Sequence, residues 1–491
     1  MPPFGVQEFR SANFTGLNLT LTQPAHIAST QASTQGWTPS PNGRGSIDII
    51  WSCVVTMFLC SWSALCLQLP SRTDSQFDIL WRRSWLTALC ALGPEFTFQL
   101  ALGQWCSARQ SVRDFHASGI TSWTMKHAFH ADSGGFFLRT PDFREIPIDA
   151  KQLLYLINHQ YIKDPELTEN DIDGKNRVDV LLRLISIGQI LWFCVTLIAR
   201  GAQGLFITGM ELTTAAFILC SFGTTFCWWN KGADIAVPET LTSETTMAQI
   251  LIEGGDAAGK PYHRTPLDFI SREEWHWSLY WTHWINILRR IHIIFAPTSL
   301  PHDRIENTVW HDLKARGAFP AFMMLSLLYS AIFLSLWNDH FPTKTEQLLW
   351  RIASLSMLGS IVLYFMITGY AWVWYPALQK YFQTRAYFRK SESETKTALE
   401  EQVEIAVERS AQGLKARSRL SDIAARLRNN SILKDPSLDV PLKATLPIYV
   451  VGFFYCCSRT AIWILDIIQF RSLPSSAYTT VNWGGFFAHL G

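Results

Sequence analysis

Three ionisable side chains lie inside long apolar stretches of this sequence and a fourth opens such a stretch, where they could do chemistry; Asp48 and Asp339 flank the ends of other stretches. Glu95 follows a Gly-Pro pair in the apolar run ALCALGPEFTFQLALGQW, residues 88–105. Glu211 opens another apolar run, and Arg459 and Asp466 lie in the last one. A charge at the centre of a bilayer costs roughly 2.5 to over 10 kcal/mol, so such residues usually face a protein interior and often mark function.

Glu95 combines an acid with a helix break. Proline lacks a backbone donor and frees the carbonyl four residues upstream, so neighbouring groups or water must satisfy the local polarity. Burial disfavours an ionised carboxylate, and we expect Glu95 to hold its proton at neutral pH and to act as an acid. The alternative is a structural hydrogen bond across helices.

The other three residues have structural alternatives too. Glu211 lies near a predicted helix start, where a carboxylate complements the positive end of the helix dipole, so it could cap the helix or serve as a second catalytic carboxylate. Arg459 and Asp466 are two helical turns apart, about 10 Å, and share a face without touching. They could fix the register of the bundle or take part in function.

Aromatic residues make up 13% of the chain, with 21 Trp. Ring faces attract cations. A dry chamber that holds a protonated carboxyl among rings is what polyene cyclisation needs, because the acid starts the carbocation and the rings stabilise it. Trp192, Phe193 and Phe226 are the candidate rings, and Glu95 and Glu211 the candidate catalytic carboxylates.

The elements that must position these residues are membrane helices. Apolar runs near 20 residues match the roughly 30 Å hydrocarbon core of a bilayer. Such runs are present at Ile49 to Leu69, Trp85 to Trp105, Leu184 to Ala199, Leu212 to Trp229, Phe319 to Trp337, Ile352 to Tyr375 and Thr445 to Phe470. The sequence therefore predicts an all-α, polytopic transmembrane helical bundle with six or seven spans.

Basic residues predict the orientation of the bundle. The long loops 106–184, 230–318 and 376–444 carry 10, 9 and 13 Lys plus Arg, whereas residues 200–211 and 338–351 carry 1 and 2. Because cytosolic loops hold such an excess, we expect the long loops in the cytosol and the C-terminus in the lumen.

Residues 85–105 decide the number of spans. If they cross the bilayer there are seven spans and a cytosolic N-terminus; if they form a re-entrant turn there are six and a lumenal N-terminus. Of the two we favour seven. A lumenal C-terminus in either case argues against a G-protein-coupled receptor.

The predicted organisation has four parts: a polar, disordered N-terminal tail (1–45), the bundle with its first two cytosolic loops (46–375), a charged helical cytosolic loop (376–444), and the last span with a short tail (445–491). Asn13 and Asn18 lie in the sequons NFT and NLT, which would be glycosylated only if the tail is lumenal.

One loop segment has a helical pattern of its own. Residues 274–295 place on one helical face Trp277, Trp281, Trp284, Leu288, Ile291 and Phe295. This pattern predicts an amphipathic helix at the cytosolic membrane interface or a helix packed on a soluble cap.

Several other classes of partner are not expected. The histidine spacings reproduce no metal-binding motif, and the sequence shows no dinucleotide fingerprint or haem signature, so we expect no metal and no cofactor. A net charge of +2 without a basic, aromatic-interleaved motif argues against nucleic acid.

The stretch IDGKNRVDVLLRLISIGQILWFCVTLIARGAQGLFITGMELTTAAFILCSFGTTFCWWNKGADIAVP, with RGSIDIIWSC at the first span, resembles a group of filamentous-fungal polytopic membrane proteins. The similarity extends over the whole architecture and is strongest over residues 172–238. Some proteins of this kind are membrane-bound terpene cyclases that act on farnesylated or epoxyfarnesylated aromatic (meroterpenoid) precursors. Where usual members read DKSKAD and WWNKP, this chain reads DGKNRVD and WWNKG, which suggests a specialised member.

Together the residues and the resemblance predict an integral membrane terpene cyclase of the endoplasmic reticulum. Glu95 would protonate a terminal epoxide or alkene of a farnesyl chain, and Glu211 would be the second carboxylate or base. The partners expected are a prenylated aromatic substrate and membrane lipid. The alternatives are a transporter or channel, in which the same acids carry protons or bind solute, and a receptor or scaffold.

Overall fold

The computed structural model describes residues 34–40, 43–71, 74–174, 180–232, 237–271, 300–370 except 308, 314 and 316, residue 374, and residues 442–486. Four predicted features fall wholly or mostly outside these residues: Asn13, Asn18, the tryptophan-rich helix 274–295 and the charged loop 376–444.

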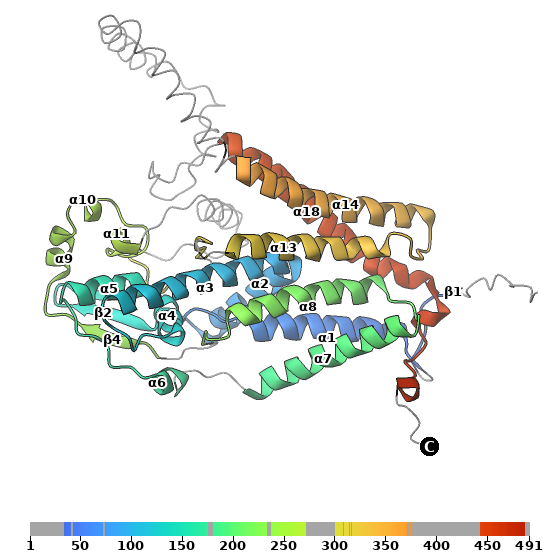
Figure 1. Ribbon diagram of the computed structural model, residues 1–491, viewed down its shortest axis with the longest axis horizontal. Helices are drawn as coiled ribbons and strands as arrows, with labels where there is room; N and C mark the ends of the chain where they lie inside the picture. Colours follow the sequence, from blue (N-terminus) through green and yellow to red (C-terminus); the bar gives the residue numbers. More distant parts are fainter. Residues whose placement is uncertain are drawn as a thin grey trace, which may run out of the picture.

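Helices dominate the described chain. Those long and apolar enough to cross a membrane are α1 (Ser46–Ala64), α7 (Val180–Ala202), α8 (Gly209–Cys227), α13 (Ala318–Ile332, continued by the 3-10 turn η1, Phe333–Leu336), α14 (Lys344–Gly369) and α18 (Leu442–Ile468). They form an elongated bundle in which α14 and α18 lie along each other (Figure 1). Apolar side chains such as Ile185, Leu191 and Ile198 are exposed on the outside of α7, as is typical of a surface that contacts lipid.

The Gly-Pro sequence ends one helix and starts the next. α2 (Gln76–Leu92) stops at Gly93 and α3 (Pro94–Ala117) begins at Pro94, with an angle of 113° between the two helices. Arg83 of α2 donates a hydrogen bond to the carbonyl of Trp62 near the end of α1 (3.1 Å). α3 runs out of the bundle at the same end, so the pair enters and leaves on one face (Figure 1).

The two ends of the described chain meet at the opposite end of the bundle. Strand β1 (Thr34–Gln35) pairs antiparallel with β5 (Leu473–Pro474), and the hydroxyl of Tyr478 donates to the carbonyl of Gly36 (2.8 Å). A chain that starts and finishes on one face crosses an even number of times. This geometry favours six crossings with a re-entrant α2–α3 pair over the seven that we expected.

The N-terminal tail that we expected to be disordered through residue 45 is folded from Thr34 onwards, apart from residues 41–42, which are outside the described chain. Backbone pairing with β5 and the ion pair between Arg44 and Glu211 hold it against the bundle. Composition alone could not show this, because the partner strand lies more than 430 residues away.

The described parts of the first two expected loops, 106–184 and 230–318, form a cap beyond one end of the bundle (Figure 1). The cap contains α4 (Met125–Asp132), α5 (Ala150–Asn158), α6 (Glu169–Gly174), α9 (Met247–Glu253), α10 (Gly255–Ala258), α11 (Asp268–Ser271), β2 (Phe136–Thr140), β3 (Phe143–Ile148) and β4 (Glu239–Thr242). Strand β2 pairs antiparallel with β3 and parallel with β4, so one small sheet joins two loops. The all-α prediction is wrong here: aromatic and β-branched residues flank a Pro-Asp turn, which favours a hairpin.

The cap is packed around its own core. The rings of Phe115 and Trp123 stack with centroids 3.8 Å apart, and Phe136, Ile148 and Leu153 are fully buried. α3 has 24 residues and a length of about 36 Å. It therefore connects the interior of the bundle directly to the cap.

Candidate functional site

Glu95 lies at the start of α3 because of the helix break before it. Gly93 ends α2, and Pro94 takes a first-turn position of α3, where its missing N–H leaves no helical bond unmade. A Cβ atom at residue 93 would lie 2.5 Å from a ring carbon of Phe96, so only glycine fits without a shift of that ring. The break turns the chain sharply and directs the first turn of α3 into the bundle.

The carboxyl group of Glu95 is completely buried. One of its oxygens accepts a hydrogen bond from the hydroxyl of Tyr455 on α18, while Oε2 has no hydrogen-bond partner among the described residues. The ring of Phe96 lies edge-on to that of Tyr455, with centroids 5.6 Å apart. Glu95 is shielded from water, and no arginine of the described chain forms an ion pair with it within 4.0 Å, although Arg459 acts on it electrostatically from farther away.

Tyr455 belongs to a buried polar face of α18. Tyr455, Arg459, Asp466 and Gln469 follow one another at four, seven and three residues, spacings that keep them on one side of a helix and of the 3-10 turn η4 (Gln469–Arg471) that continues it. All four are at most 5% exposed. This face therefore lines the interior of the bundle with groups that an apolar core normally excludes.

Arg459 is surrounded by aromatic rings. Its guanidinium carbon lies 5.5 Å from the ring centroid of Tyr329, 5.3 Å from that of Phe333 and 5.6 Å from that of Trp463. None of its three guanidinium nitrogens has a hydrogen-bond partner among the described residues. Ring faces thus contact this buried charge directly, and the carboxyls of Glu95 and Asp466 act on it electrostatically from beyond ion-pair distance.

The same face of α18 also binds the start of α8. Asp466 accepts a hydrogen bond from the hydroxyl of Thr213 (2.7 Å), and the side-chain oxygen of Gln469 accepts one from the backbone N–H of Gly209 (2.8 Å). These contacts satisfy a helix N-terminus inside the protein. The predicted separation of Arg459 and Asp466 is confirmed, since no ion pair joins them.

Glu211 has the capping geometry that we considered as the alternative to catalysis. Its Oε2 accepts hydrogen bonds from the backbone and hydroxyl of Thr208 (3.0 and 2.9 Å). Its Oε1 pairs with Arg44 and lies 3.8 Å from Nε of Arg200. Both of its oxygens are thus occupied by structural partners.

The structure does not bring Glu95 and Glu211 together. Phe98, one turn beyond Glu95 on α3, packs on Gly223 of α8, so Glu95 lies level with Cys220, which is three residues before Gly223 and interacts with Glu95 electrostatically. Cys220 is nine residues from Glu211, about 13 Å along the helix. The two carboxylates therefore cannot act on one reacting atom in this arrangement.

The candidate rings also lie apart from Glu95. Trp192 is 59% exposed on α7 and stacks on Trp483, with ring centroids 5.4 Å apart, and Phe226 is 69% exposed on α8. Phe193 is buried, but in the cluster that joins α1, α7 and α8. The rings associated with the Glu95–Arg459 region are those of Phe96, Tyr329, Phe333, Tyr455 and Trp463.

Sequence reasoning missed Arg200, at the end of α7. Its side chain is fully buried and donates to the backbone carbonyls of Phe206 (2.7 Å), Thr479 (2.8 Å), Ala477 (3.0 Å) and Ser476 (3.1 Å). Its position at the edge of an apolar run made it look like a solvated flanking residue. The signal available was that it is the only basic residue between 200 and 211.

No metal site is evident in the described part of the chain, where no three His, Cys, Asp or Glu side chains gather closely enough to hold an ion. All ten cysteines are free thiols.

Comparison with known proteins gives one result. Residues 17–253 match the model of a family of unknown function, DUF8562. No curated protein and no solved structure matches the chain. The match includes Glu95 and Glu211, whereas Tyr455, Arg459 and Asp466 lie beyond it. This chain is thus similar to that family over the bent α2–α3 pair, the apolar helices α1, α7 and α8, and much of the cap.

Proposed function

We propose that the protein is an integral membrane enzyme that cyclises the farnesyl or epoxyfarnesyl chain of a prenylated aromatic compound, with Glu95 as the acid. The observation that supports this most is the complete burial of Glu95, with one carboxyl oxygen held by Tyr455 and the other without a protein partner among the described residues. The resemblance to fungal membrane proteins supports the substrate class and a place in the endoplasmic reticulum.

The proposed reaction is a redox-neutral isomerisation. Protonated Oε2 of Glu95 donates to the epoxide oxygen, the epoxide C–O bond breaks as the neighbouring double bond attacks its carbon, and the last carbocation loses a proton to the enzyme. The hydroxyl of Tyr455 stabilises the carboxylate that remains on Glu95. An epoxide is the better substrate, because its oxygen is far more basic than an alkene carbon.

This geometry changes the roles of the other candidates. Phe96 and Tyr329 take the place of Trp192 and Phe226 as rings that stabilise the carbocation, and Glu211 is left with a structural role. Water exclusion would come from burial inside the bundle, which prevents premature quenching of the cation.

The test is conversion of a farnesylated phenol and of its terminal epoxide by membranes from yeast that express the protein. We expect a product of the same mass as the epoxide, and at least a 100-fold loss, on the order typical of a lost general acid, in Glu95→Gln. Glu253→Gln is a matched control, because the hydroxyl of Tyr161 donates to Glu253 in the cap just as Tyr455 donates to Glu95. Full conversion by Glu95→Gln would show that another group supplies the proton.

A transporter is the second candidate, and the polar face of α18 is the observation that favours it. Buried ionisable residues in spanning helices often mark the path of a proton or solute. Two results together would support transport over cyclisation. Proteoliposomes that contain the protein would take up protons and lose this uptake in Asp466→Asn, and no isomeric product would form.

A further inference from the structure

Arg459 carries a charge that the described residues do not neutralise by contact. Its side chain is 1% exposed, and Nε, Nη1 and Nη2 all lack hydrogen-bond partners there. Buried polar groups are almost always hydrogen-bonded, so an unpartnered guanidinium in a native structure calls for a ligand, an ion or water. Five N–H donors in a planar fork match the geometry of a carboxylate or a phosphate.

Protein carboxyls are close but do not fill this role. Tyr455 lies one turn before Arg459 on α18 and holds Glu95, and Asp466 lies two turns after it. No ion pair within 4 Å joins Arg459 to either acid in the described chain. Asp466 is instead bonded to Thr213. The remaining oxygens, Glu95 Oε2 and Asp466 Oδ1, also lack partners there, so both acids keep an unpartnered oxygen in the buried region around Arg459.

The position of Arg459 restricts the kind of ligand. It lies at the middle of the 26-residue apolar segment Leu446–Arg471, about 20 Å from either end. The rings of Tyr329, Phe333 and Trp463 surround it. A small hydrated anion would have to lose its water to reach this depth, whereas a carboxylate on an apolar molecule can arrive from the lipid with its tail remaining in an apolar environment.

We infer that Arg459 binds the carboxylate of a lipophilic ligand, with its guanidinium as a bidentate donor. This inference rests on the proposed function in one respect, because it identifies the substrate as a prenylated aromatic acid rather than a neutral phenol. The rings around the guanidinium then contact the apolar part next to the carboxylate. Glu95, held by Tyr455 one turn away, lies beside the bound molecule.

The test compares binding of a radiolabelled farnesylated dihydroxybenzoic acid with that of its methyl ester, using purified protein in lipid nanodiscs. We expect the acid to bind about 10-fold more tightly than the ester, the effect of a charge-assisted bidentate pair. In Arg459→Gln this preference disappears while ester binding remains, which also shows that the variant is folded. Arg459→Lys, which keeps the charge but not the fork, retains part of the preference.

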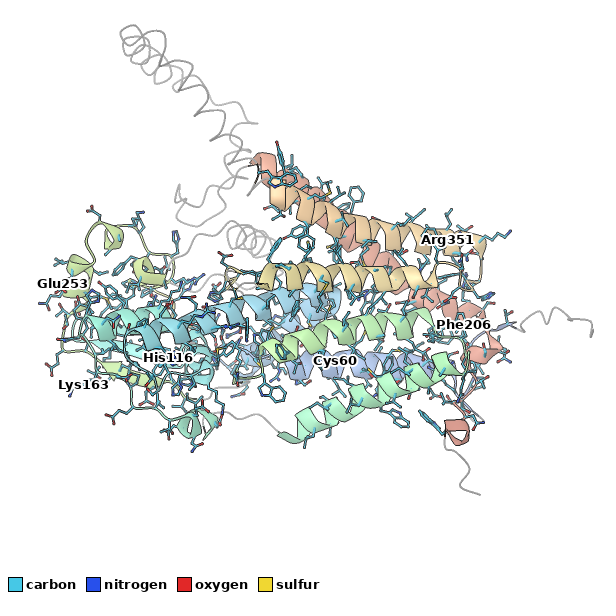
Figure 2. All side chains as sticks on the ribbon, viewed as in Figure 1. Cys60, His116, Lys163, Phe206, Glu253 and Arg351 are labelled. Atoms are coloured by element: carbon cyan, nitrogen blue, oxygen red, sulfur yellow. The ribbon has the colours of Figure 1, made fainter. Side chains whose placement is uncertain are left out.

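Arg351→Gln is the matched control. Arg351 also lies over a tryptophan ring, that of Trp337 (5.1 Å), but its Nε donates to the carbonyl of Trp337 (2.9 Å) and it lies at the end of the bundle away from the cap (Figure 2). We expect this variant to keep the full preference for the acid.

Two results would overturn the inference. Equal binding of acid and ester by the unaltered protein would show that Arg459 does not take a carboxylate, and complete displacement of the acid by sodium acetate would assign the site to a small free anion. Neither result depends on turnover. A protein that prefers the acid through Arg459 but forms no cyclised product would refute the proposed function and leave this inference standing.

Discussion

Replacing Arg200 by Met should destabilise the end of the bundle where the two chain ends meet. Met has a similar length and keeps the apolar contacts, but it cannot donate to the carbonyls of Phe206, Ser476, Ala477 and Thr479. The carbonyl of Ala477 keeps a hydrogen bond from Arg44 (3.3 Å). The carbonyls of Phe206, Ser476 and Thr479 therefore lose the hydrogen bond that Arg200 donates to each of them. Hydrogen bonds from a charged donor contribute about 1.5–3 kcal/mol each, and the relief of arginine desolvation offsets part of this.

We expect a net loss of about 3–5 kcal/mol, or roughly 5–10 °C in apparent Tm at about 2 °C per kcal/mol. The assay is thermal unfolding in detergent followed by size-exclusion chromatography, with limited proteolysis to detect release of residues 475–483. Arg471→Met is the control, because Arg471 is 55% exposed and makes a surface ion pair with Glu346, worth about 1 kcal/mol at most. An Arg200→Met protein that melts within 2 °C of this control would refute the structural role.

Three further predictions test other parts of the structure. Burial, reinforced by the neighbouring Asp149 carboxyl, raises the pKa of Asp132 in the cap from 3.8 to about 7; the folded protein then holds this proton more tightly than the unfolded chain, so stability falls as pH rises from about 4 to 7. Asp132→Asn can keep the hydrogen bonds to Ala150 and Ser107, and it should weaken the dependence of the apparent Tm on pH. An apparent Tm that still falls as steeply with pH would show that another group titrates. Gly209→Ala should lower the free energy of unfolding by about 1–3 kcal/mol, because the new Cβ would lie 2.6 Å from Asp466 Oδ1. Gly188→Ala is the control: its Cβ would have no atom within 4 Å, so this variant should be neutral or stabilising in the same thermal melts. Because Thr34 pairs with Pro474 and the segment after the last apolar helix is expected in the lumen, Asn13 and Asn18 should carry glycans that endoglycosidase H removes. A gel mobility unaffected by Asn13→Gln and Asn18→Gln would place that tail in the cytosol.

Much of the bundle could be predicted because membrane helices are encoded locally. An apolar run of about 20 residues satisfies its own backbone hydrogen bonds, so length and composition locate a span without knowledge of its neighbours. The fate of residues 85–105 could not be determined in this way. Whether a Gly-Pro break kinks a span or turns it back depends on what each half packs against, here α1, α8 and the cap.

The candidate site could be proposed from the sequence only in part. Glu95 was identified from a local conflict between an acid, a helix breaker and an apolar run. Its partner Tyr455 is 360 residues away, and one sequence contains no information that pairs them. The candidate rings Trp192, Phe193 and Phe226 lie within apolar runs, yet a helix in a bilayer turns only part of its surface toward the protein. Trp192 and Phe226 are on the outward side.

The cap and the folded tail show the same limit of local patterns. Residues 136–148 have the aromatic and β-branched composition of a hairpin, but they were grouped with polar loop sequence because their neighbours were charged. Arg200 entered only the count of basic residues in the short segment 200–211, whereas both Arg200 and Arg44 pair with Glu211 in the first turn of α8. In each case a partner from a distant part of the chain determines the role.

The most direct test of the central claim is the steady-state rate of isomer formation from the farnesyl epoxide by purified protein, compared between the unaltered chain and Glu95→Gln. If Glu95 donates the proton in the transition state, kcat falls at least about 100-fold while KM stays within about threefold. A kcat within threefold of the unaltered enzyme would contradict the account, because the buried carboxyl would then have no part in the chemistry.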